Sequence, residues 1–396
     1  MTEWKIYRLG DIASFSQGIQ VDIDKQLPYK KDGYVRFIRI VDFTKTNEPY
    51  RYIETPKKQY LTNSGDIVMI RYGSQTAGLV VKSFEGAIAN NMFKITLDEQ
   101  VVDRDFIYYA LSQEDVFSSL RNAQSSSTMP AITFEIASRI QLKIPSLEEQ
   151  RRIAGILGAI DDKIENNRRI NTNLELQAQA LYKQWFVDNR SDDWETKPLS
   201  EIAEFIGGYS YKGNELVESS STAMATIKNF ERKGGFKVEG FKDIVASPKL
   251  KAEQHAKLFD ILVAHTDLTQ NADVIGNAEI LLTCGKYSDI IFSMDLVKVL
   301  PKACFSYKYL LAAMLKNFHF KAHCLGYVNG TTVLHMSKKA LPEYIVSCPS
   351  NSEAEKMDRA FKAYYHKMAE ILQENETLAT LRDTLLPKLM NGEIKV

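Results

Sequence analysis

The sequence lacks the features that would place it in a membrane or in an oxidising compartment. No uninterrupted apolar run approaches the roughly 20 residues that a membrane-spanning helix requires. The first residues, MTEWKIYRLGD, do not have the basic-then-apolar layout of a signal peptide. The four cysteines all lie in the second half and form no C-x-x-C pair: Cys284, Cys304, Cys324 and Cys348. We therefore expect a cytoplasmic protein with free thiols and no membrane contact.

The sequence also has no net charge, because 50 Lys and Arg residues balance 50 Asp and Glu residues. A nucleic-acid-binding domain is usually basic, so this balance counts against that class for the chain as a whole. The charge is nevertheless uneven: between Lys25 and Lys58, nine basic residues stand against four acidic ones, a local excess of five. A patch of this size can bind phosphate on a neutral protein, although an ordinary solvated surface is the simpler explanation of the patch taken alone.

Motifs of catalytic or cofactor chemistry are incomplete. The stretch Asn47–Tyr50 (NEPY) resembles the (N/D)-P-P-(Y/F) motif of amino-methyltransferases, but its second position differs and no F-x-G-x-G cofactor loop precedes it. Gly73–Gly78 has two glycines at P-loop spacing without the Lys and hydroxyl that should follow. His319, His323 and Cys324 resemble part of a zinc site, but a fourth ligand is missing, so packing or surface histidines are the better interpretation. We expect no catalytic residue, no cofactor and no metal.

What the sequence does have is an internal repeat, in which residue types of the first half return in order in the second. The first block returns at a shift of 190 residues: Trp4, Leu9, Ile12, Ala13, Phe15 and Gly18 match Trp194, Leu199, Ile202, Ala203, Phe205 and Gly208. Further matches join Phe37–Phe43 to Met224–Phe230, Asp66–Met69 to Asp260–Val263, and Ile144–Ser146 to Cys348–Ser350. The drifting shift indicates insertions in loops, as duplicated domains accumulate when they diverge in what they bind.

Each half shows the same order of predicted elements, with β-rich runs first and a short helix after them. The predicted strands are Val35–Val41, Ile67–Tyr72 and Phe93–Leu97 in the first half, and Ala225–Ile227, Asp260–Ala264 and Leu296–Leu300 in the second. The predicted short helices are Asp105–Ser112 and Tyr307–Lys316. The fold class that follows is α+β, with two similar mixed α/β domains.

A long helix follows each domain. Both helices are predicted to begin with an S-x-x-E capping box directly after a proline, at Ser146 and at Ser350. Inside them, residues alternate at spacings of four and three, which is the a/d pattern of a coiled coil. The first seam is Ile153, Leu157, Ile160, Ile164, Asn167, Asn171, Leu174, Ala178, Leu181 and Trp185. The second, 204 residues later, is Met357, Phe361, Tyr364, Met368, Ile371, Asn375, Leu378, Arg382, Leu385 and Leu389.

Matched seams predict that the two helices pack on each other as an antiparallel coiled coil within one chain. Asn171 and Asn375 occupy equivalent seam positions. They either fix the register and the partner or face a loosely packed stretch or a turn. The predicted parts are domain 1 (1–145), the first spacer helix (146–189), domain 2 (190–349) and the second spacer helix (350–396). A helix from Ile153 to Trp185 would be roughly 48 Å long, enough to span the about 34 Å between successive major grooves.

Taken together, the chain resembles the specificity subunit of a type I restriction–modification enzyme along essentially its whole length. The motifs that carry the resemblance are Trp4 with Leu9–Ile12, Ser64–Met69 leading to Gly73, and above all Ile144–Ile153 (IPSLEEQRRI) with Leu157 and Ile160-Asp161. The second copy, Pro349–Glu355, keeps Pro and Glu but loses Leu and Gln. This departure puts in doubt any contact of the second site that depends on the equivalent of Gln150.

The resemblance implies two target-recognition domains, each of which reads one half of a split, asymmetric double-stranded DNA sequence. It also implies that the helices set the spacing and dock two methyltransferase (modification) subunits, and that restriction/translocase subunits complete the complex. The chain itself would perform no chemistry. Two alternatives remain: a structural adaptor that does not bind DNA, and a degenerate DNA methyltransferase or nuclease.

Polar side chains on loops at strand ends are the candidates for hydrogen bonds to base edges and phosphates. In the first half these candidates are Arg36, Arg39, Arg71, Ser74, Gln75, Thr76, Ser127 and Thr128. In the second half they are Tyr211, Lys212, Lys228, Asn329, Thr331 and Thr332. The stretches 124–128 and 329–332 fall at matching points before the long helices, as DNA-facing loops or as flexible connectors. For each residue individually, an ordinary polar loop is an equally good explanation.

Overall fold

The computed structural model describes residues 4–45, 48–73, 75–122 and 131–396. The chain divides into two compact units: unit 1 contains Met1–Lys163 and Ala379–Val396, and unit 2 contains Ile164–Leu378. The long helices α6 (Leu147–Lys183) and α11 (Asn351–Met390) each contribute to both units. Among the described residues, no helix is both long enough and apolar enough to cross a membrane.

Unit 1 is built from three sheets, with strand orders β2-β9-β6-β7, β4-β3-β8-β5 and β1-β10. Their strands are β1 (Lys5–Arg8), β2 (Ala13–Gln17), β3 (Tyr34–Ile38), β4 (Arg51–Glu54), β5 (Leu61–Thr62), β6 (Ile67–Ile70), β7 (Val80–Lys82), β8 (Gly86–Ile88), β9 (Met92–Leu97) and β10 (Gln141–Ile144). The helices are α1 (Leu9–Ile12), α2 (Val41–Thr44), α3 (Arg104–Leu111), α4 (Glu114–Asn122) and α5 (Phe134–Ser138).

Unit 2 repeats these sheets in the orders β12-β20-β16-β18, β14-β13-β19-β15 and β11-β23, and adds a small sheet, β17-β22-β21. Its strands are β11 (Glu195–Pro198), β12 (Ala203–Gly207), β13 (Thr222–Ala225), β14 (Lys242–Asp243), β15 (His255–Ala256), β16 (Ile261–Ala264), β17 (Thr266–Asp267), β18 (Ala278–Ile280), β19 (Asp289–Phe292), β20 (Leu296–Pro301), β21 (Val328–Asn329), β22 (Leu334–Met336) and β23 (Ile345–Cys348). The short helices are α7 (Leu199–Ile202), α8 (Lys308–Leu315), α9 (Phe318–Leu325) and α10 (Ala340–Glu343).

The internal repeat is therefore a repeat of structure, and the prediction of two similar α+β domains with two long helices is confirmed. Gly18 and Gly208, matched in the sequence, sit at equivalent places against neighbouring backbone. A Cβ at Gly18 would collide with the carbonyl oxygen of Ala89, and one at Gly208 with that of Ser293. The predicted domains exclude the long helices, whereas each compact unit includes part of both helices.

The central strand of each unit is buried on both faces, which explains its uninterrupted apolar sequence. In β6, Ile67 and Met69 belong to the core beneath the helices, and Val68 and Ile70 belong to the core shared with the second sheet. In β16 the same alternation divides Ile261 and Val263 from Leu262 and Ala264. The strand end that leads to the candidate loops is therefore fixed from both sides in each unit.

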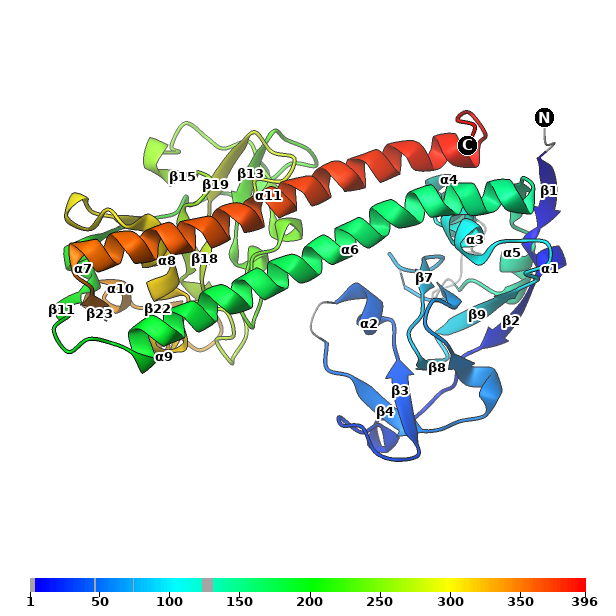
Figure 1. The fold of residues 1–396 in the computed structure, drawn as a ribbon, viewed down its shortest axis with the longest axis horizontal. Helices are drawn as coiled ribbons and strands as arrows, with labels where there is room; N and C mark the ends of the chain where they lie inside the picture. The colour runs from blue at the N-terminus through cyan, green and yellow to red at the C-terminus, as the bar shows by residue number, and fades with distance from the viewer. Residues whose placement is uncertain (1–3, 46–47, 74, 123–130) are drawn as a thin grey trace. The chain divides into compact units, whose positions relative to one another are not determined.

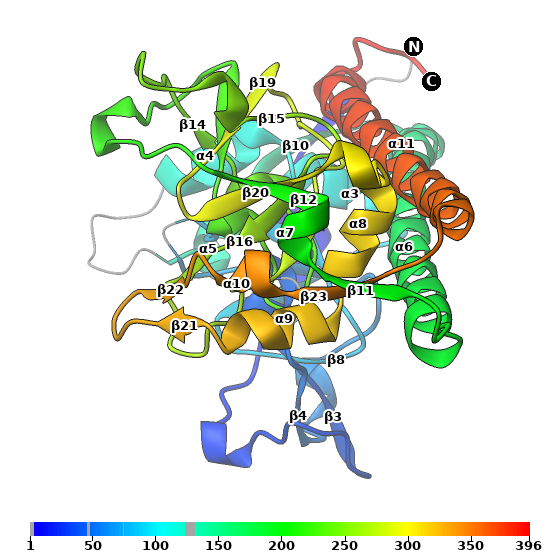
Figure 2. The ribbon, with the colours of Figure 1, turned by 90° about the vertical axis from the view of Figure 1, so that its left-hand side faces the viewer.

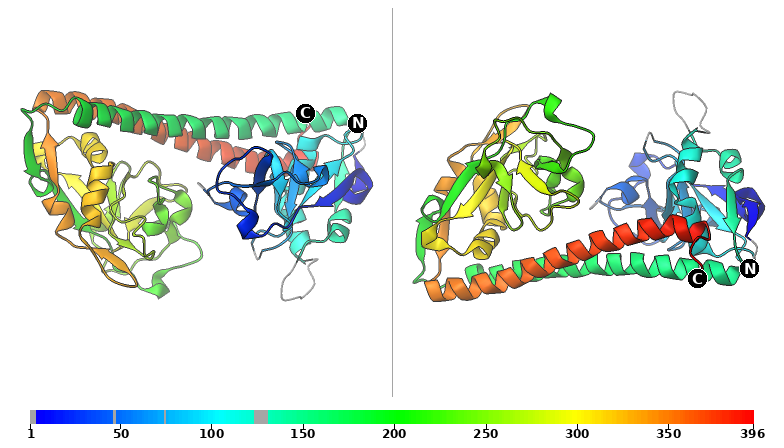
Figure 3. Two further views of the ribbon diagram at one scale, coloured as in Figure 1. Left: turned by 90° about the horizontal axis from the view of Figure 1, so that it is seen from below. Right: turned by 90° about the horizontal axis from the view of Figure 1, so that it is seen from above.

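Helices α6 and α11 run antiparallel and side by side (Figure 1 and Figure 3). In unit 1, Asp161 pairs with Arg382, and in unit 2, Asn171 contacts Met368, so one helix ascends in number as the other descends. All twenty predicted seam residues are buried or half-buried. Arg382, the one charged member of the seam, places Nη1 2.8 Å from Oδ1 of Asp161, whose Oδ2 accepts from Tyr109.

The seam asparagines form hydrogen bonds across the helix pair. Asn167 is 1% exposed and donates from Nδ2 to Glu374 Oε2 (2.8 Å) and to Asn375 Oδ1 (2.9 Å). Asn171 Nδ2 donates to the carbonyl oxygen of Met368 (3.2 Å). These contacts lie within continuous helix, which favours register fixing over the alternative of a turn.

Both predicted capping boxes begin the long helices. Glu149 N donates to Ser146 Oγ (3.4 Å), and Glu353 N donates to Ser350 Oγ (3.4 Å). In the second box, Ser350 N also donates to Glu353 Oε2 (3.1 Å), which completes the reciprocal pair.

Candidate nucleic-acid interface

In unit 1, the end of β6 is tied to the segment that precedes α5. Arg71, directly after β6, accepts from Ile132 N through its carbonyl oxygen (3.0 Å), and its Nε donates to the carbonyl oxygen of Ile132 (3.3 Å). Tyr72 and Ala131 form an isolated antiparallel bridge. The beginning of the loop after β6, at Arg71 and Tyr72, therefore lies beside Ala131 and Ile132, although the two segments are far apart in the sequence.

The loop after β6 closes on its own backbone. Thr76 Oγ1 donates to the carbonyl oxygen of Tyr72 (2.9 Å), and Gly73 has a φ of +119°, a conformation that favours glycine. Gln75 is exposed at the surface of this loop. Three predicted contacts lie outside the described residues: Ser74, Ser127 and Thr128.

Arg36 and Arg39 are both held by Asp42. Arg36 Nη2 lies 3.3 Å from Asp42 Oδ1, and Arg39 Nε lies 3.1 Å from Asp42 Oδ2. The guanidinium of Arg36 is also sandwiched between the rings of Tyr50 and Phe84, 3.9 and 4.2 Å from their centroids. The two arginine side chains are only 16% and 19% exposed. Both guanidinium groups are paired within unit 1, and this pairing does not favour a direct contact with DNA. Their contact with DNA stays a prediction.

Unit 2 has a regular sheet where unit 1 has a single bridge. Strand β17 pairs with β22, and β22 pairs with β21, all antiparallel. The pair Thr266–His335 occupies the place of the bridge in unit 1, since β17 follows β16 as Tyr72 follows β6. The predicted residues lie on the exposed hairpin between β21 and β22 (Figure 2): Asn329, Thr331 and Thr332.

The other predicted residues of unit 2 belong to the part built around β14-β13-β19-β15. Lys212 and Lys228 are exposed. Tyr211 is half-buried, and its hydroxyl accepts from Lys242 Nζ (3.4 Å). These residues are therefore separate in the fold from the β17-β22-β21 hairpin.

The prediction missed the loop after β17, which lies against the hairpin. Gln270 Nε2 donates to the carbonyl oxygen of Thr331 (2.8 Å). Applying the shift that joins Asp66 to Asp260 would have identified it, because Gln270 falls 194 residues after Thr76.

Basic side chains lie beside this loop and hairpin. Burial lowers the pKa of His265, and the neighbouring His335 and Lys338 lower it further. His335 and Lys338 are exposed. The surface of unit 2 therefore combines amide and hydroxyl groups with the exposed side chains of His335 and Lys338, a combination suited to base edges and phosphates.

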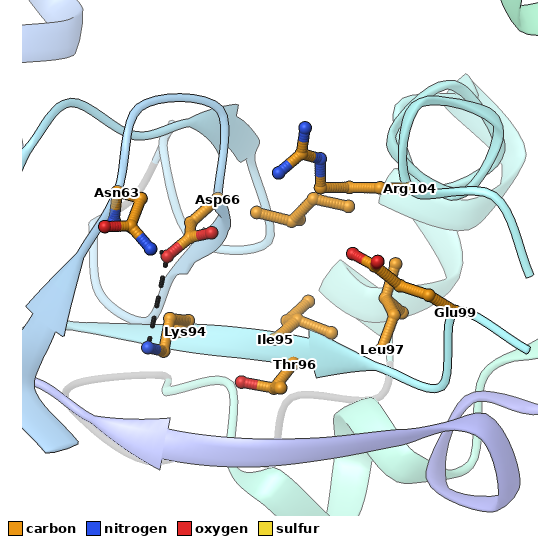
Figure 4. Close-up of a pocket in the computed structure, with 9 residues that line it drawn as sticks. Asn63, Asp66, Lys94, Ile95, Thr96, Leu97, Glu99 and Arg104 are labelled. Atoms are coloured by element: carbon orange, nitrogen blue, oxygen red, sulfur yellow. Dashed lines mark hydrogen bonds and ion pairs between the residues drawn. The ribbon is translucent and has the colours of Figure 1, made fainter.

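A polar anchor at the start of the central strand, the end opposite the candidate loop, is duplicated. In unit 1, Lys94 Nζ lies 4.0 Å from Asp66 Oδ2 and donates to the carbonyl oxygen of Leu61 (2.9 Å). In unit 2, Lys298 Nζ lies 3.7 Å from Asp260 Oδ2 and donates to the carbonyl oxygen of His255. In unit 1, this ion pair lines a pocket together with Arg104, Glu99 and Asn63 (Figure 4). The pair holds the loop before β6 or β16 on the sheet, so its role is structural.

Of the predicted cluster, His323 and Cys324 make packing contacts, whereas His319 is exposed. His323 Nε2 lies 2.8 Å from the carbonyl oxygen of Ala340, and Cys324 is buried against Gly276. Burial raises the pKa of the Cys324 thiol to about 12, which disfavours the thiolate that a metal would need.

Comparison with known proteins relates the chain to one family. The family model described as "Type I restriction modification DNA specificity domain" matches residues 1–176. The type I restriction enzyme MjaVIII specificity subunit of Methanocaldococcus jannaschii is 21% identical over 421 residues, which cover 100% of this chain and 93% of the relative. Residues 1–176 therefore match the type I specificity domain, and the chain along its whole length is similar to a type I restriction–modification specificity subunit.

Other specificity subunits agree. That of the type I restriction enzyme HindI of Haemophilus influenzae is 30% identical over 200 residues, 48% of this chain and 42% of the relative. The solved structure of the type I restriction–modification system S subunit from M. genitalium matches with a TM-score of 0.54 at 18% identity. The match covers 98% of this chain and 96% of that one, so the two chains share a fold.

Within the matched residues, Gln150 is a structural residue. It is fully buried, and its Oε1 accepts from Asp103 N (2.8 Å) at the start of α3. Its Nε2 donates to the carbonyl oxygens of Pro145 (3.0 Å) and Val101 (3.3 Å). Gln150 therefore connects α6 to the segment before α3 through buried hydrogen bonds within unit 1.

Proposed function

We propose that this chain, as a specificity subunit, recognises a bipartite, asymmetric double-stranded DNA sequence, with unit 1 reading one half-site and unit 2 the other. The observation that carries the proposal is the duplication itself. Two units with the same strand orders each present a loop and a second segment at the end of the same central strand. Duplicated scaffolds with divergent loops suit two different half-sites.

The recognition chemistry is hydrogen bonding without catalysis. In unit 2, the exposed groups are the side chains of Gln270, Asn329, Thr331 and Thr332, with His335 and Lys338 nearby. In unit 1, the corresponding groups are those of Arg71 and Gln75 with the predicted Ser74, Ser127 and Thr128. Amides read adenine bidentately, and arginine reads guanine. The exposed lysines between Lys25 and Lys58 would add contacts to phosphates.

The helix pair would set the distance between the half-sites. A heptad seam buried along α6 and α11, with its register fixed by Asn167 and Asn171, suits a spacer of constant length. The outward faces of the helices would dock two methyltransferase subunits, and restriction/translocase subunits would complete the complex in the cytoplasm. The chain would need no cofactor of its own.

The experiment is methylation mapping by single-molecule sequencing of DNA from cells that express this chain with its cognate methyltransferase. We expect methylated adenines inside a two-part motif with a fixed, non-specific gap. Cells that express the methyltransferase alone are the control. A soluble, methyltransferase-bound complex that yields no such motif would contradict the proposal and favour a structural adaptor.

A further inference from the structure

The loop 268–274 and the β21–β22 hairpin of unit 2 are organised by a carboxylate that faces inward. We propose that Asp267 is a positioning residue, which holds this loop and hairpin as one reading surface and so determines the half-site of unit 2 without touching DNA. The inference rests on the proposed function and assigns a role that the sequence did not suggest.

Asp267 spans the two ends of the loop. Its side chain is almost completely buried, at 3% exposure for the residue. Oδ1 accepts from Thr269 N (2.8 Å), and Oδ2 accepts from Val274 N (2.8 Å). Hydrogen bonds from backbone N–H groups to a carboxylate are short and about twice as strong as neutral ones. One side chain therefore fixes both the first turn and the last residue of the loop.

The same residue joins the loop to the hairpin. Asp267 lies in β17, where it pairs with Leu334 of β22. At the far side of the loop, Gln270 donates to the carbonyl oxygen of Thr331 on the hairpin. Two points of attachment leave the loop and the hairpin little freedom to move separately, which preorganises the polar groups that they expose.

Neighbouring contacts hold the loop in an uncommon conformation. Ala272 has a φ of +50°, in the left-handed region that disfavours a residue with a side chain. Lys321 of α9 donates to the carbonyl oxygen of Asp273 (2.6 Å) and to Asn277 Oδ1 (2.7 Å). The loop is thus built against its own backbone preference, as loops that present functional groups often are.

The fold does not require a carboxylate at this point. In unit 1, the position after Tyr72 is Gly73, and the loop closes through the hydroxyl of Thr76. Unit 1 therefore has the equivalent central strand, but its loop is closed by Thr76 instead of a carboxylate. A residue that differs between two copies of one scaffold, and that shapes only the candidate surface, is expected to affect what that copy reads.

The test is Asp267→Asn in the complete methyltransferase complex, once the wild-type motif is known. The amide keeps the volume, but its NH2 group faces a backbone N–H and loses one of the two hydrogen bonds. We expect discrimination against single-base changes in one half-site to fall about tenfold, the equivalent of one base contact. Discrimination in the other half-site should stay within about twofold of wild type, as separate sites predict.

Asp260→Asn is the matched control. Asp260 is also buried in unit 2 and accepts a hydrogen bond from a backbone N–H group, that of Lys257. Lys257 lies in the loop before β16 and not in the candidate surface. Asp260→Asn should lower stability and leave both discrimination ratios unchanged. Gln270→Ala, an exposed change that does not threaten folding, should reduce discrimination in the same half-site about threefold, the loss of roughly one neutral hydrogen bond.

Unchanged discrimination by both Asp267→Asn and Gln270→Ala would overturn the inference, as would equal losses in both half-sites. If the wild-type complex methylates no two-part motif, the proposed function fails instead. The two failures are therefore distinguishable.

Discussion

Units 1 and 2 solve the same structural problem with different residues. In unit 1, the start of α3 is held by Gln150 of α6, which accepts from Asp103 N. In unit 2, the position of Gln150 is taken by the buried Ala354, and Asp358 of α11 accepts from the first backbone N–H groups of α8 at 2.8 and 2.9 Å. In unit 1, Asp103 itself caps α3, because its Oδ1 accepts from Phe106 N (3.0 Å). Tyr307 at the start of α8 makes no such side-chain bond, and Asp358 of the long helix supplies the cap instead. The comparison teaches that the requirement for a cap was retained while its residue changed.

Retention and divergence also separate by location. The ion pair of Lys94 with Asp66 recurs as Lys298 with Asp260 beneath the sheets. At the strand ends, by contrast, Gly73 is replaced by Asp267, and a single bridge is replaced by a three-stranded sheet. This ion pair is the same in both units, whereas the residues at the strand ends differ. This is the pattern expected of two readers with different targets.

The largest effect is expected from the spacer that the two units share. Matched insertions of one heptad in α6 and α11 add about 10 Å to each helix at ~1.5 Å per residue. The mapped gap between half-sites should change while both half-sites stay the same. Altered half-sites with an unchanged gap would show that the helices do not set the spacing.

A second change should affect unit 2 alone. Lys316 Nζ lies 2.6 Å from Glu279 and 3.2 Å from Glu175; burial alone would lower its pKa, but these carboxylates raise it above the usual range. Lys316→Met leaves Glu279 buried without its cation and should destabilise unit 2 by about 3–5 kcal/mol. Hydrogen exchange should quicken in unit 2 and not in unit 1.

The control for that change is Lys367→Met, which removes an exposed ion pair with Glu370. It should alter stability by less than about 1 kcal/mol. Equal exchange in the two variants would show that the buried cluster is not needed for unit 2.

A smaller effect tests a glycine position that the units treat differently. Gly65 has a φ of +85°, and its counterpart in unit 2 is Phe259, with a φ of +68° and its ring stacked on His366 at 4.3 Å. Gly65→Ala has room for the methyl group but incurs the left-handed strain, so unit 1 should lose about 1–2 kcal/mol. Gly158→Ala in α6 should instead stabilise it by about 0.5–1 kcal/mol. Thermal unfolding of both variants measures the difference, and stabilisation by Gly65→Ala would contradict it.

Local sequence patterns predicted the elements well where a face is buried continuously. The elements β6, β9 and both long helices were predicted because the spacing of their apolar residues indicates which faces are buried. The run Val35–Val41 ends as a strand at Ile38, since Asp42 accepts from Arg39 N and turns the chain into α2. Periodicity cannot reveal such a side-chain cap.

The candidate surface was only partly predictable. Asn329, Thr331 and Thr332 were predicted because their types and position were repeated, and they lie exposed on the hairpin. Arg36 was chosen for its charge, but partners distant in the sequence, such as Phe84, occupy its guanidinium. Asp267 and Gln270 were missed because their roles depend on pairing between β17 and β22. Long-range contacts of this kind leave no local signature.

The central claim is that each unit reads its own half-site, and exchanging one unit tests it most directly. Residues 1–145 would be replaced by the corresponding domain of another specificity subunit, and the methylated motif would be mapped with the same methyltransferase. We expect one half-site to change, while the other half-site and the gap are retained. A change in both half-sites, or in neither, would contradict it.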